Sequence, residues 1–420
     1  MSIPTLADAH EVLRRYWGYG DFRYYQRKAV LAALQGRDCL AVLPTGGGKS
    51  ICYQVPGLLL PGLTLVVSPL ISLMQDQVRA LRQRDVPAAY LSSTQTPRRR
   101  HAVRDAVIEG RVRLLYVAPE RLPSLSADVA QLRIALLAVD EAHCISEWGH
   151  DFRPHYRAIG RYRRLLGEPR TIAVTGTATP ATRQDILRVL GLRTPVRVVR
   201  SHDRPNLFLA ARRFRRERDR VREAASLLVH VNGTAIVYVP THDRTDGVAT
   251  VLRQWGLSAL PYHAGLPGRA RRELLARFLD GRCRVMVATS AFGMGIDKPD
   301  VRLVLHLGVP PRPESYFQEA GRAGRDGLPS RCEVLWTNGD LTLASKLAGL
   351  DVGEPAARRL GEARRLGLAA MRRYLTTRGC RRRVLLRYLG ETVRGCTGCD
   401  RCGSGQALRG PRPGTGEGVH

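Results

Sequence analysis

Short runs of apolar residues alternate with longer amphipathic segments through most of the chain. In the first part the runs are Cys39–Leu43, Leu63–Ser68, Val112–Val117, Ile134–Val139 and Thr171–Val174. A strand buried on both faces reads as an uninterrupted apolar run, whereas the segments between these runs have the period of helices. The alternation therefore predicts βαβ units on a parallel sheet, which is an α/β fold.

The same alternation starts again after the stretch Ser201–Asn206. Its apolar runs are Thr234–Val239, Ala259–Pro261, Arg284–Ala288 and Val301–His306. Because each set of runs can form a sheet and a core of its own, we expect two α/β domains of similar size. The first would cover residues 1–200 and the second residues 201–340.

Strand patterns stop near Leu341, and Arg-rich helical patterns follow. Residues 341–405 hold 14 Lys and Arg against 5 Asp and Glu, and we expect them to form a small helical subdomain. The last stretch, Gly403–His420, is rich in Gly and Pro and has almost no apolar residues. Such a composition cannot bury a core, so we expect a disordered tail at residues 406–420.

The charge of the chain indicates a polyanionic partner. Lys and Arg number 67 against 37 Asp and Glu, which gives a formal net charge of +30. A protein that neutralises phosphates gains free energy by releasing their counterions, so nucleic acid is the first expectation and anionic membrane a distant second. The alternative is the Arg bias of a GC-rich genome, because only four of the basic residues are Lys.

The sequence shows no signal for a membrane protein. No N-terminal segment combines a basic start with an apolar core, and no apolar run approaches the roughly 20 residues that span a bilayer. We expect a cytoplasmic, nucleoid-associated protein with no membrane partner. Scattered cysteines that read as buried thiols agree with a reducing compartment; they are Cys39, Cys52, Cys144, Cys283 and Cys332.

Four further cysteines gather near the end of the chain, at Cys380, Cys396, Cys399 and Cys402. Four thiolates at these short spacings favour tetrahedral Zn²⁺. An iron–sulfur cluster is the first alternative, but Gly-Ser-Gly-Gln follows Cys402 where a cluster motif continues to Cys-Pro. Free thiols are the second alternative. Since no His or carboxylate completes an open position, we expect the metal to be structural.

A glycine-rich segment at residues 43–50 reads Leu-Pro-Thr-Gly-Gly-Gly-Lys-Ser between a predicted strand and a predicted helix. Backbone N–H groups in such a loop can hold phosphates together with the helix N-terminus. The strict motif has Gly where this chain has Leu43, so a glycine-rich turn without a ligand is the alternative. We expect Ser50 to bind Mg²⁺ and Lys49 to meet the β- and γ-phosphates. The other candidate nucleotide-binding residues are Thr45, Gly46, Gly47 and Gly48.

An acidic pair, Asp140 and Glu141, directly follows the run Ile134–Val139. The pair would emerge at the carboxyl end of a strand, where open α/β sheets bind their ligands. Asp140 would hold Mg²⁺, and Glu141 would orient or deprotonate an attacking water. An acidic pair at a strand end is common by itself, but together with Lys49 it predicts a phosphate-hydrolysing centre.

Residues 144–156 place aromatic, imidazole and guanidinium groups directly behind the acidic pair. Trp148, Phe152 and Tyr156 can stack on nucleobases. The candidates for contact with phosphates are His150, Arg153 and His155. Core packing is the ordinary alternative for the aromatic side chains.

Two arginines, Arg322 and Arg325, lie in the segment Gln318–Gly327. If this segment is helical they share a face, and they could reach a γ-phosphate across a cleft between the two domains. Arg325 is our candidate for stabilising the transition state, and a solvated Arg-Gly turn is the alternative. Gly293–Asp297, which follows a predicted strand, reads as a tight loop suited to responding at the domain interface.

Three polar or aromatic residues near the N-terminus, Tyr19, Arg23 and Gln26, precede the first predicted strand. Gln26 can offer both a donor and an acceptor to the edge of adenine. An ordinary surface glutamine is the alternative at this position.

These motifs together resemble the RecQ family of superfamily 2 DNA helicases, over about residues 10–402. The resemblance implies two tandem RecA-like domains followed by a helical zinc-binding module, with ATP, Mg²⁺ and Zn²⁺ as cofactors. It also implies that Arg23 and Gln26 read adenine with Tyr19 stacking nearby, and that Trp148–Pro154 couples DNA contact to hydrolysis. The segments that carry it are Leu43–Gln54, Val66–Gln77, Tyr116–Leu122, Asp140–Tyr156, Ala291–Asp300, Ser315–Gly327 and Cys380–Glu391 with its cysteines.

The chain departs from the family pattern in three places. Tyr24-Tyr25 stand where the family usually has Pro-Gly, which would alter nucleotide affinity. Gly176 stands where the family usually has Ala, which bears on coupling between the domains. The chain ends shortly after Cys402, so we expect the winged-helix and HRDC domains of many members, and with them the usual duplex-contacting wedge, to be missing.

We expect an ATP-dependent DNA helicase that moves 3′ to 5′ on single-stranded DNA and unwinds duplexes in recombination and repair. Its partners would be single-stranded and tailed duplex DNA. The first alternative, motivated by the expected loss of the wedge, is a DNA-stimulated ATPase that binds or anneals strands without unwinding by itself. An RNA helicase is the second, and the RecQ-like residues 144–156 and cysteines disfavour it.

Overall fold

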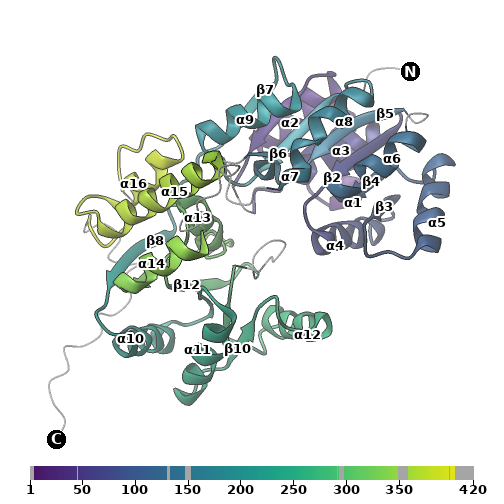
Figure 1. Cartoon of the computed structure of the whole chain (residues 1–420). Coiled ribbons are helices and arrows are strands. Elements are labelled where there is room, and N and C mark those ends of the chain that lie inside the picture. The colour runs from purple at the N-terminus through teal and green to yellow at the C-terminus, as the bar shows by residue number, and fades with distance from the viewer. Residues whose placement is uncertain are drawn as a thin grey trace, which may run out of the picture. The chain divides into compact units, whose positions relative to one another are not determined.

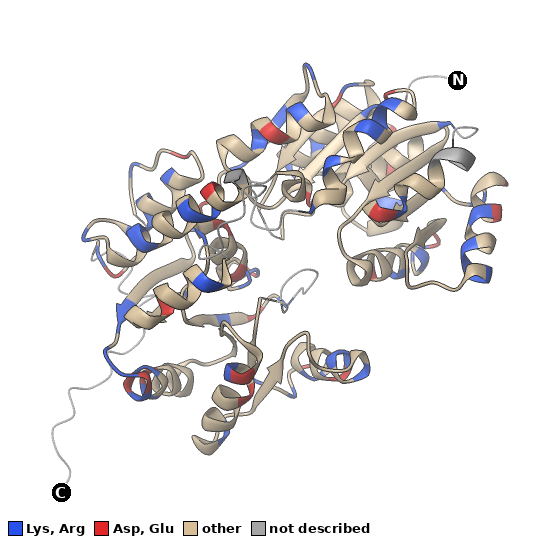
Figure 2. Cartoon of the chain, in the orientation of Figure 1, with Lys and Arg blue, Asp and Glu red and all other residues tan. Residues whose placement is uncertain are grey.

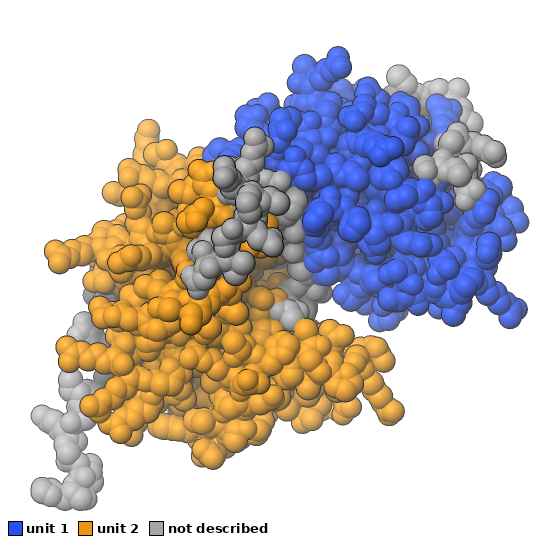
Figure 3. All heavy atoms as spheres, viewed as in Figure 1, with its two compact units in different colours: residues 1–202 blue, residues 203–420 orange. Residues whose placement is uncertain are grey.

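The chain forms two compact units, residues 1–202 and 203–420 (Figure 3). Each unit has its own sheet and core. The computed structural model describes residues 4–44, 46–129, 133–146, 153–290, 292, 298–348, 358–396 and 398–402. In these parts of the chain every helix falls short of the length and apolarity that crossing a bilayer requires.

The first unit is built on a seven-stranded sheet in the order β3-β4-β2-β5-β6-β1-β7, with all neighbours parallel. Its inner strands are buried along their whole length, which explains their uninterrupted apolar sequences. The strands are β1 (Cys39–Val42), β2 (Leu63–Val67), β3 (Ala88–Leu91), β4 (Leu114–Val117), β5 (Ile134–Val139), β6 (Thr171–Thr175) and β7 (Val196–Val199).

Helices cover both faces of this sheet (Figure 1). One core lies under α1 (Leu6–Trp17), α2 (Tyr24–Leu34), α3 (Ile51–Leu59) and α4 (Ile71–Arg82). The core of the opposite face lies under α5 (Pro97–Ile108), α7 (Pro154–Arg157), α8 (Ile159–Leu165) and α9 (Pro180–Leu190). The remaining elements are α6 (Leu122–Val129) and the 3₁₀ helices η1 (Pro119–Arg121) and η2 (Ala142–Ile145).

The second unit is built on a six-stranded parallel sheet in the order β10-β11-β9-β12-β13-β8. Its strands are β8 (Leu207–Arg213), β9 (Thr234–Tyr238), β10 (Ala259–Tyr262), β11 (Val285–Ala288), β12 (Val301–Leu307) and β13 (Ser330–Trp336). On one face the core lies under α10 (Glu217–His230) and α11 (His242–Gln254).

The opposite face of the second sheet carries the C-terminal helices. Its core includes side chains of α12 (Gly268–Leu279), α13 (Pro313–Ala320), α14 (Asn338–Leu347), α15 (Arg358–Thr376) and α16 (Arg381–Tyr388). Buried Cys399 belongs to the same core. The Arg-rich helices that follow the sheet therefore share a core with it.

The predicted fold class is confirmed: two parallel α/β sheets are followed by helices that lead into the cysteine cluster. Every apolar run that predicted a strand overlaps one. Lys and Arg lie on helices of both units, among them α5, α12 and α16 (Figure 2). The expected tail at residues 406–420 lies outside the described residues.

Candidate nucleotide, nucleic-acid and zinc sites

The glycine-rich loop connects β1 to α3, as its sequence predicts. A Cβ on Gly47 would lie 2.7 Å from the carbonyl oxygen of Pro44, and Gly48 has a φ of +67°. Only glycine meets both conditions without strain. Lys49 and Ser50 are half-buried behind the loop, and Gly46 is exposed. Thr45 lies outside the described residues.

The N-terminal element is hydrogen-bonded to this loop. The side-chain amide of Gln26 donates to the carbonyl oxygens of Gly47 and Gly48 at 3.1 Å each, and its oxygen accepts from the backbone N–H of Arg23 at 2.9 Å. The guanidinium of Arg23 donates to the carbonyl oxygen of Gly46 at 3.0 Å. Gln26 is only 7% exposed, so the surface-glutamine alternative is wrong. Tyr19 is 59% exposed.

The acidic pair stands at the carboxyl end of β5, as expected. Asp140 is buried, and its Oδ1 accepts from the N–H of Glu141 at 2.9 Å. Burial and the charge of Glu141 raise the pKa of Asp140 to about 7, and the positive charge of Lys49 opposes that rise. Only β6 separates β1, which leads into the glycine-rich loop, from β5, which leads into the acidic pair, so the loop and the pair lie at one edge of the parallel sheet.

Glu141 is held in an uncommon backbone conformation and faces a buried histidine. Its φ is +45°, in the left-handed region that a non-glycine residue rarely adopts. Its Oε2 lies 3.3 Å from Nδ1 of His143, and the same nitrogen lies 2.8 Å from the hydroxyl of Thr175 at the end of β6. His143 and Thr175 were not predicted as site residues; the position of His143 next to the acidic pair was the available signal.

The residues at this edge fit a hard divalent cation. Mg²⁺ prefers oxygen ligands and is commonly held by one or two carboxylates with water and phosphate oxygens. Asp140 and Ser50 offer such oxygens, and a cation would relieve the repulsion between Asp140 and Glu141 that raises the pKa of Asp140.

The segment behind the acidic pair is described only in part. Trp148, His150 and Phe152 lie outside the described residues. Arg153 is half-buried, and its guanidinium donates to the carbonyl oxygen of Pro69 at 2.7 Å. Tyr156 has no exposed surface, and its hydroxyl donates to the backbone oxygen of Asp140 at 3.1 Å. Stacking of Tyr156 on a base is therefore wrong, and core packing is correct.

Arg322 and Arg325 do not lie on a helix, so the condition under which they would share a helix face is not met. Helix α13 ends at Ala320, because Gly321 and the residues after it form consecutive turns. Arg322 is buried and Arg325 is half-buried. Arg322 lies close enough to Tyr238, at the end of β9, that its charge opposes the rise in the pKa of that phenol that burial causes.

Two residues that sequence reasoning missed hold this turn. Arg204 donates to the carbonyl oxygens of Ala323 at 3.0 Å and Gly324 at 2.6 Å. The side-chain amide of Asn206 also donates to Gly324, at 2.9 Å. Both residues belong to the stretch Ser201–Asn206, whose polar sequence gave no signal of contact with a segment so distant along the chain. The predicted loop Gly293–Asp297 lies outside the described residues.

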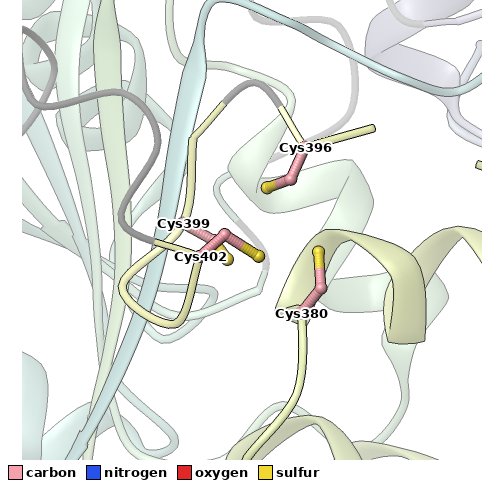
Figure 4. Close-up of side chains that lie close together, drawn as sticks. All are labelled: Cys380, Cys396, Cys399 and Cys402. Carbon is pink, nitrogen blue, oxygen red and sulfur yellow. The ribbon is translucent and has the colours of Figure 1, made fainter. Parts of the chain in front are cut away.

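The four C-terminal cysteines converge in space (Figure 4). One sulfur from each of them lies within 4.8 Å of all the others. A tetrahedral Zn²⁺ with Zn–S bonds of about 2.3 Å sets its sulfurs about 3.8 Å apart, so the cluster fits this ion. Although burial opposes it, hydrogen bonds from the backbone of Arg401 and Arg381 lower the pKa of Cys399 to about 7, which favours the thiolate that zinc binds.

Two basic residues beside the cysteine cluster, Arg381 and Arg382, bind other groups of this chain. Arg381 is fully buried and donates to Asp400 at 2.5 Å and to the carbonyl oxygens of Tyr374 at 2.6 Å and Ala211 at 3.0 Å. Arg382 is buried as well and forms an ion pair with Asp203. These two arginines fasten α16 to the second sheet.

Three family models match successive parts of the chain. Residues 23–186 match the DEAD/DEAH box helicase family, and residues 219–327 match the helicase conserved C-terminal domain. Residues 339–403 match the RecQ zinc-binding family. The last match contains all four clustered cysteines and confirms zinc as a cofactor.

Curated relatives match most of the chain. The ATP-dependent DNA helicase RecQ of Synechocystis is 42% identical over 82% of this chain and 72% of its own length. Its namesakes from Pasteurella multocida and Bacillus subtilis are each 40% identical, over 95% and 94% of this chain. This chain spans 63% and 66% of the lengths of those two relatives.

Solved structures of lower identity share the fold. The DUF1998 helicase MrfA bound to DNA and AMPPNP aligns with a TM-score of 0.68 at 19% identity, over 87% of this chain and 56% of that one. The Mycobacterium smegmatis helicase Lhr bound to ssDNA and AMP-PNP aligns with a TM-score of 0.61 at 20% identity, over 86% and 57%. The sequence matches and the shared fold lead to one assignment: the chain belongs to the RecQ family of DNA helicases.

Proposed function

We propose that this protein is an ATP-dependent DNA helicase that moves 3′ to 5′ on single-stranded DNA and unwinds duplexes in recombination and repair. The observation that carries the proposal is that the glycine-rich loop with Lys49 and the pair Asp140 and Glu141 lie at the same edge of one parallel sheet. A phosphate loop and an acidic pair in this arrangement are what nucleotide hydrolysis requires. Its place of action would be the cytoplasm, on the nucleoid.

The residues of the first unit divide the work of hydrolysis. The loop residues Thr45–Gly48 would hold the phosphates through backbone N–H groups, and Lys49 would meet the β- and γ-phosphates. Ser50 and Asp140 would hold Mg²⁺, which when bound neutralises charge on the phosphates. Glu141 would orient the attacking water or take its proton, with its carboxylate held beside His143.

The base of the nucleotide would lie against the N-terminal element. Arg23 and Gln26 are tied to the glycine-rich loop, so groups on these residues stand next to the phosphate site. We propose that they read adenine and that Tyr19 stacks nearby. The exposure of Tyr19 supports this role.

The second unit would supply positive charge to the transition state. Arg325 is the proposed finger and Arg322 the alternative. Support comes from the turn that holds both arginines, which Arg204 and Asn206 fix from outside. A fixed turn can present a guanidinium with little loss of entropy on reaction.

Single-stranded and tailed duplex DNA are the proposed partners. The net charge of +30 supports a polyanion. We propose that Trp148, His150, Phe152 and Arg153 contact the strand and couple it to hydrolysis. Arg153 directly precedes α7, and the hydroxyl of Tyr156 in that helix donates a hydrogen bond to the backbone oxygen of Asp140. This connection between Arg153 and the acidic pair supports the coupling.

The hydrolytic assignment is tested with Lys49→Ala and Glu141→Gln. Each variant should lose the ATPase activity that single-stranded DNA stimulates, by about a hundredfold or more in kcat. Glu109→Gln, which changes an exposed carboxylate at the C-terminal end of α5, is the matched control and should hydrolyse ATP like the wild type. A Lys49→Ala protein with the wild-type stimulated rate would overturn the assignment.

Unwinding is tested separately on a duplex with a 3′ single-stranded tail. ATP-dependent strand separation is the expected result, and a 5′-tailed duplex should not be opened. Strand annealing without separation would favour the ATPase that binds DNA without unwinding it. Stronger stimulation by RNA than by DNA of the same sequence would instead favour an RNA helicase.

A further inference from the structure

The tyrosine pair at the start of α2 is a feature of this chain, because the resembled family usually has Pro-Gly there. The two side chains differ in their surroundings. Tyr24 is 70% exposed, and its ring faces the ammonium of Lys28 at 4.7 Å. Tyr25 is half-buried, and the guanidinium of Arg200 lies over its ring at 5.5 Å.

The hydroxyl of Tyr25 lies over the glycine-rich loop. It accepts a hydrogen bond of 3.1 Å from Nη1 of Arg23. The same nitrogen donates to the carbonyl oxygen of Gly46 at 3.0 Å. A Cβ on Gly47 would lie 3.6 Å from the Tyr25 hydroxyl, which places the phenol in contact range of the loop itself. Tyr25, Arg23 and Gly46 therefore form a short chain of contacts.

Holding a carbonyl of this loop also aims an N–H group. In a trans peptide the C=O and the next N–H point in opposite directions. Arg23 holds the C=O of Gly46, and the N–H in that peptide, from Gly47, donates to Pro44 at 2.9 Å. Gln26 holds the next two carbonyls, those of Gly47 and Gly48. Within the described part of the chain, the N–H groups of those two peptides, from Gly48 and Lys49, donate to no acceptor.

Those two N–H groups are the donors that phosphates need. Arg23 and Gln26 hold the carbonyl oxygens on their own side of the loop. The N–H groups of the same peptides therefore point to the opposite side, where phosphates would bind. Gln26 does this directly, and Arg23 fixes the peptide before them. Arg23 is exposed, however, and a long exposed side chain loses rotamer entropy when it is held in one geometry.

We propose that Tyr25 is a positioning residue for nucleotide binding: its hydroxyl holds Arg23 on the carbonyl oxygen of Gly46 and so keeps the phosphate loop in its binding form. The inference rests on the proposed ATP binding. Arg200, which lies over the ring, keeps the hydroxyl in place. Since Pro-Gly has no hydroxyl, this support belongs to this chain and not to the family pattern.

The test compares Tyr25→Phe with Tyr24→Phe, two neighbouring changes that each remove one phenolic oxygen. Loss of one hydrogen bond should weaken binding of a fluorescent ATP analogue by about three- to tenfold in Tyr25→Phe. The kcat at saturating ATP should stay within about twofold, as expected when ground state and transition state lose binding equally. Tyr24→Phe should bind like the wild type.

A double-mutant cycle with Arg23→Met separates positioning from general loosening. If Tyr25 acts through Arg23, Tyr25→Phe should weaken binding no further in the Arg23→Met protein. Thermal unfolding of all variants checks that the fold is retained. Wild-type affinity of Tyr25→Phe, or an equal loss with and without Arg23, would overturn the inference. A wild-type protein that binds no ATP analogue would instead overturn the proposed function.

Discussion

The guanidinium of Arg204 donates a hydrogen bond of 2.6 Å to the carbonyl oxygen of Gly324, which lies 120 positions later in the chain. Gly324 stands between the two arginines proposed to act on the γ-phosphate. Its φ of +55° places it in the left-handed region, and a Cβ there would lie 2.4 Å from the Asn206 amide nitrogen. The conformation of the arginine turn thus depends on a segment before the first strand of the second sheet.

Gly324→Ala should destabilise the second unit. The new Cβ would also lie 2.7 Å from the carbonyl oxygen of Leu328, so backbone must shift. We expect a loss of about 2–4 kcal/mol in the free energy of unfolding, measured by urea denaturation. The matched control is Gly327→Ala, where φ is +85° but nothing lies within 4 Å; it should lose only about 1 kcal/mol. Equal losses would mean that the contacts with Asn206 and Leu328 carry no weight.

Arg325→Ala should lower kcat for DNA-stimulated ATP hydrolysis by about a thousandfold and leave the KM for ATP nearly unchanged. The reason is that a finger acts on charge that develops only in the transition state. Arg218→Ala, which removes an exposed side chain of α10, is the control. If Arg322→Ala gives this kinetic pattern and Arg325→Ala does not, the roles of the two arginines are reversed.

The carboxyl group of Asp140 should make stability depend on pH. Its pKa in the folded protein is raised to about 7 by burial and by the charge of Glu141, whereas in the unfolded chain it is about 3.9. A raised pKa contributes stability that is full below the unfolded value and is lost as pH rises through the folded one. Metal-free wild type should therefore lose thermal stability relative to Asp140→Asn between about pH 4 and about pH 7. Unfolding temperatures of both proteins across this range provide the measurement, and parallel curves would contradict the prediction.

Much of the fold could be predicted because buried parallel strands are continuous apolar runs. Four strands could not be predicted from the apolar pattern, for physical reasons. β3 and β7 are short and lie at the two edges of the first sheet. β8 and β13 carry charged residues, and Glu333 in β13 is fully buried. Its carboxylate forms ion pairs with Arg212 and Arg331, and such neutralisation does not show in a hydrophobic pattern.

The residues of the candidate site also divide into those that the sequence could predict and those that it could not. Lys49 and the acidic pair could be predicted because each directly follows a strand, and the ends of parallel strands meet at one edge. The hydrogen bonds to glycine carbonyl oxygens from Arg23, Gln26 and Arg204 could not be predicted from the sequence. Every stretch of backbone offers such acceptors, so no residue pattern marks the ones that are used. The spacing of Arg322 and Arg325 puts them on one face only if the segment is helical, but Gly321 and Gly324 favour turns.

Removal of zinc should unfold the loop that carries Cys396, Cys399 and Cys402, here called the cysteine loop, and should loosen α16. Cys380 is the N-cap of that helix, so its sulfur bears on both the metal and the helix start. Cys380→Ser should bind less than one zinc per chain by atomic absorption and should melt at a lower temperature than the wild type. Cys332→Ser, which changes a buried thiol outside the cluster, should keep its zinc even where it loses stability. Full zinc content in Cys380→Ser would contradict the four-cysteine site.

The cysteine loop also lies along β8, the last strand of the second sheet. The N–H of Leu209 donates to the carbonyl oxygen of Gly398 at 3.3 Å, and the oxygen of Leu209 accepts from Asp400 at 3.1 Å. An open strand edge is a template on which other chains can add, and covering it is a common defence against aggregation. We therefore expect a chain that loses its metal to expose the backbone of β8 to neighbouring chains and to associate with them.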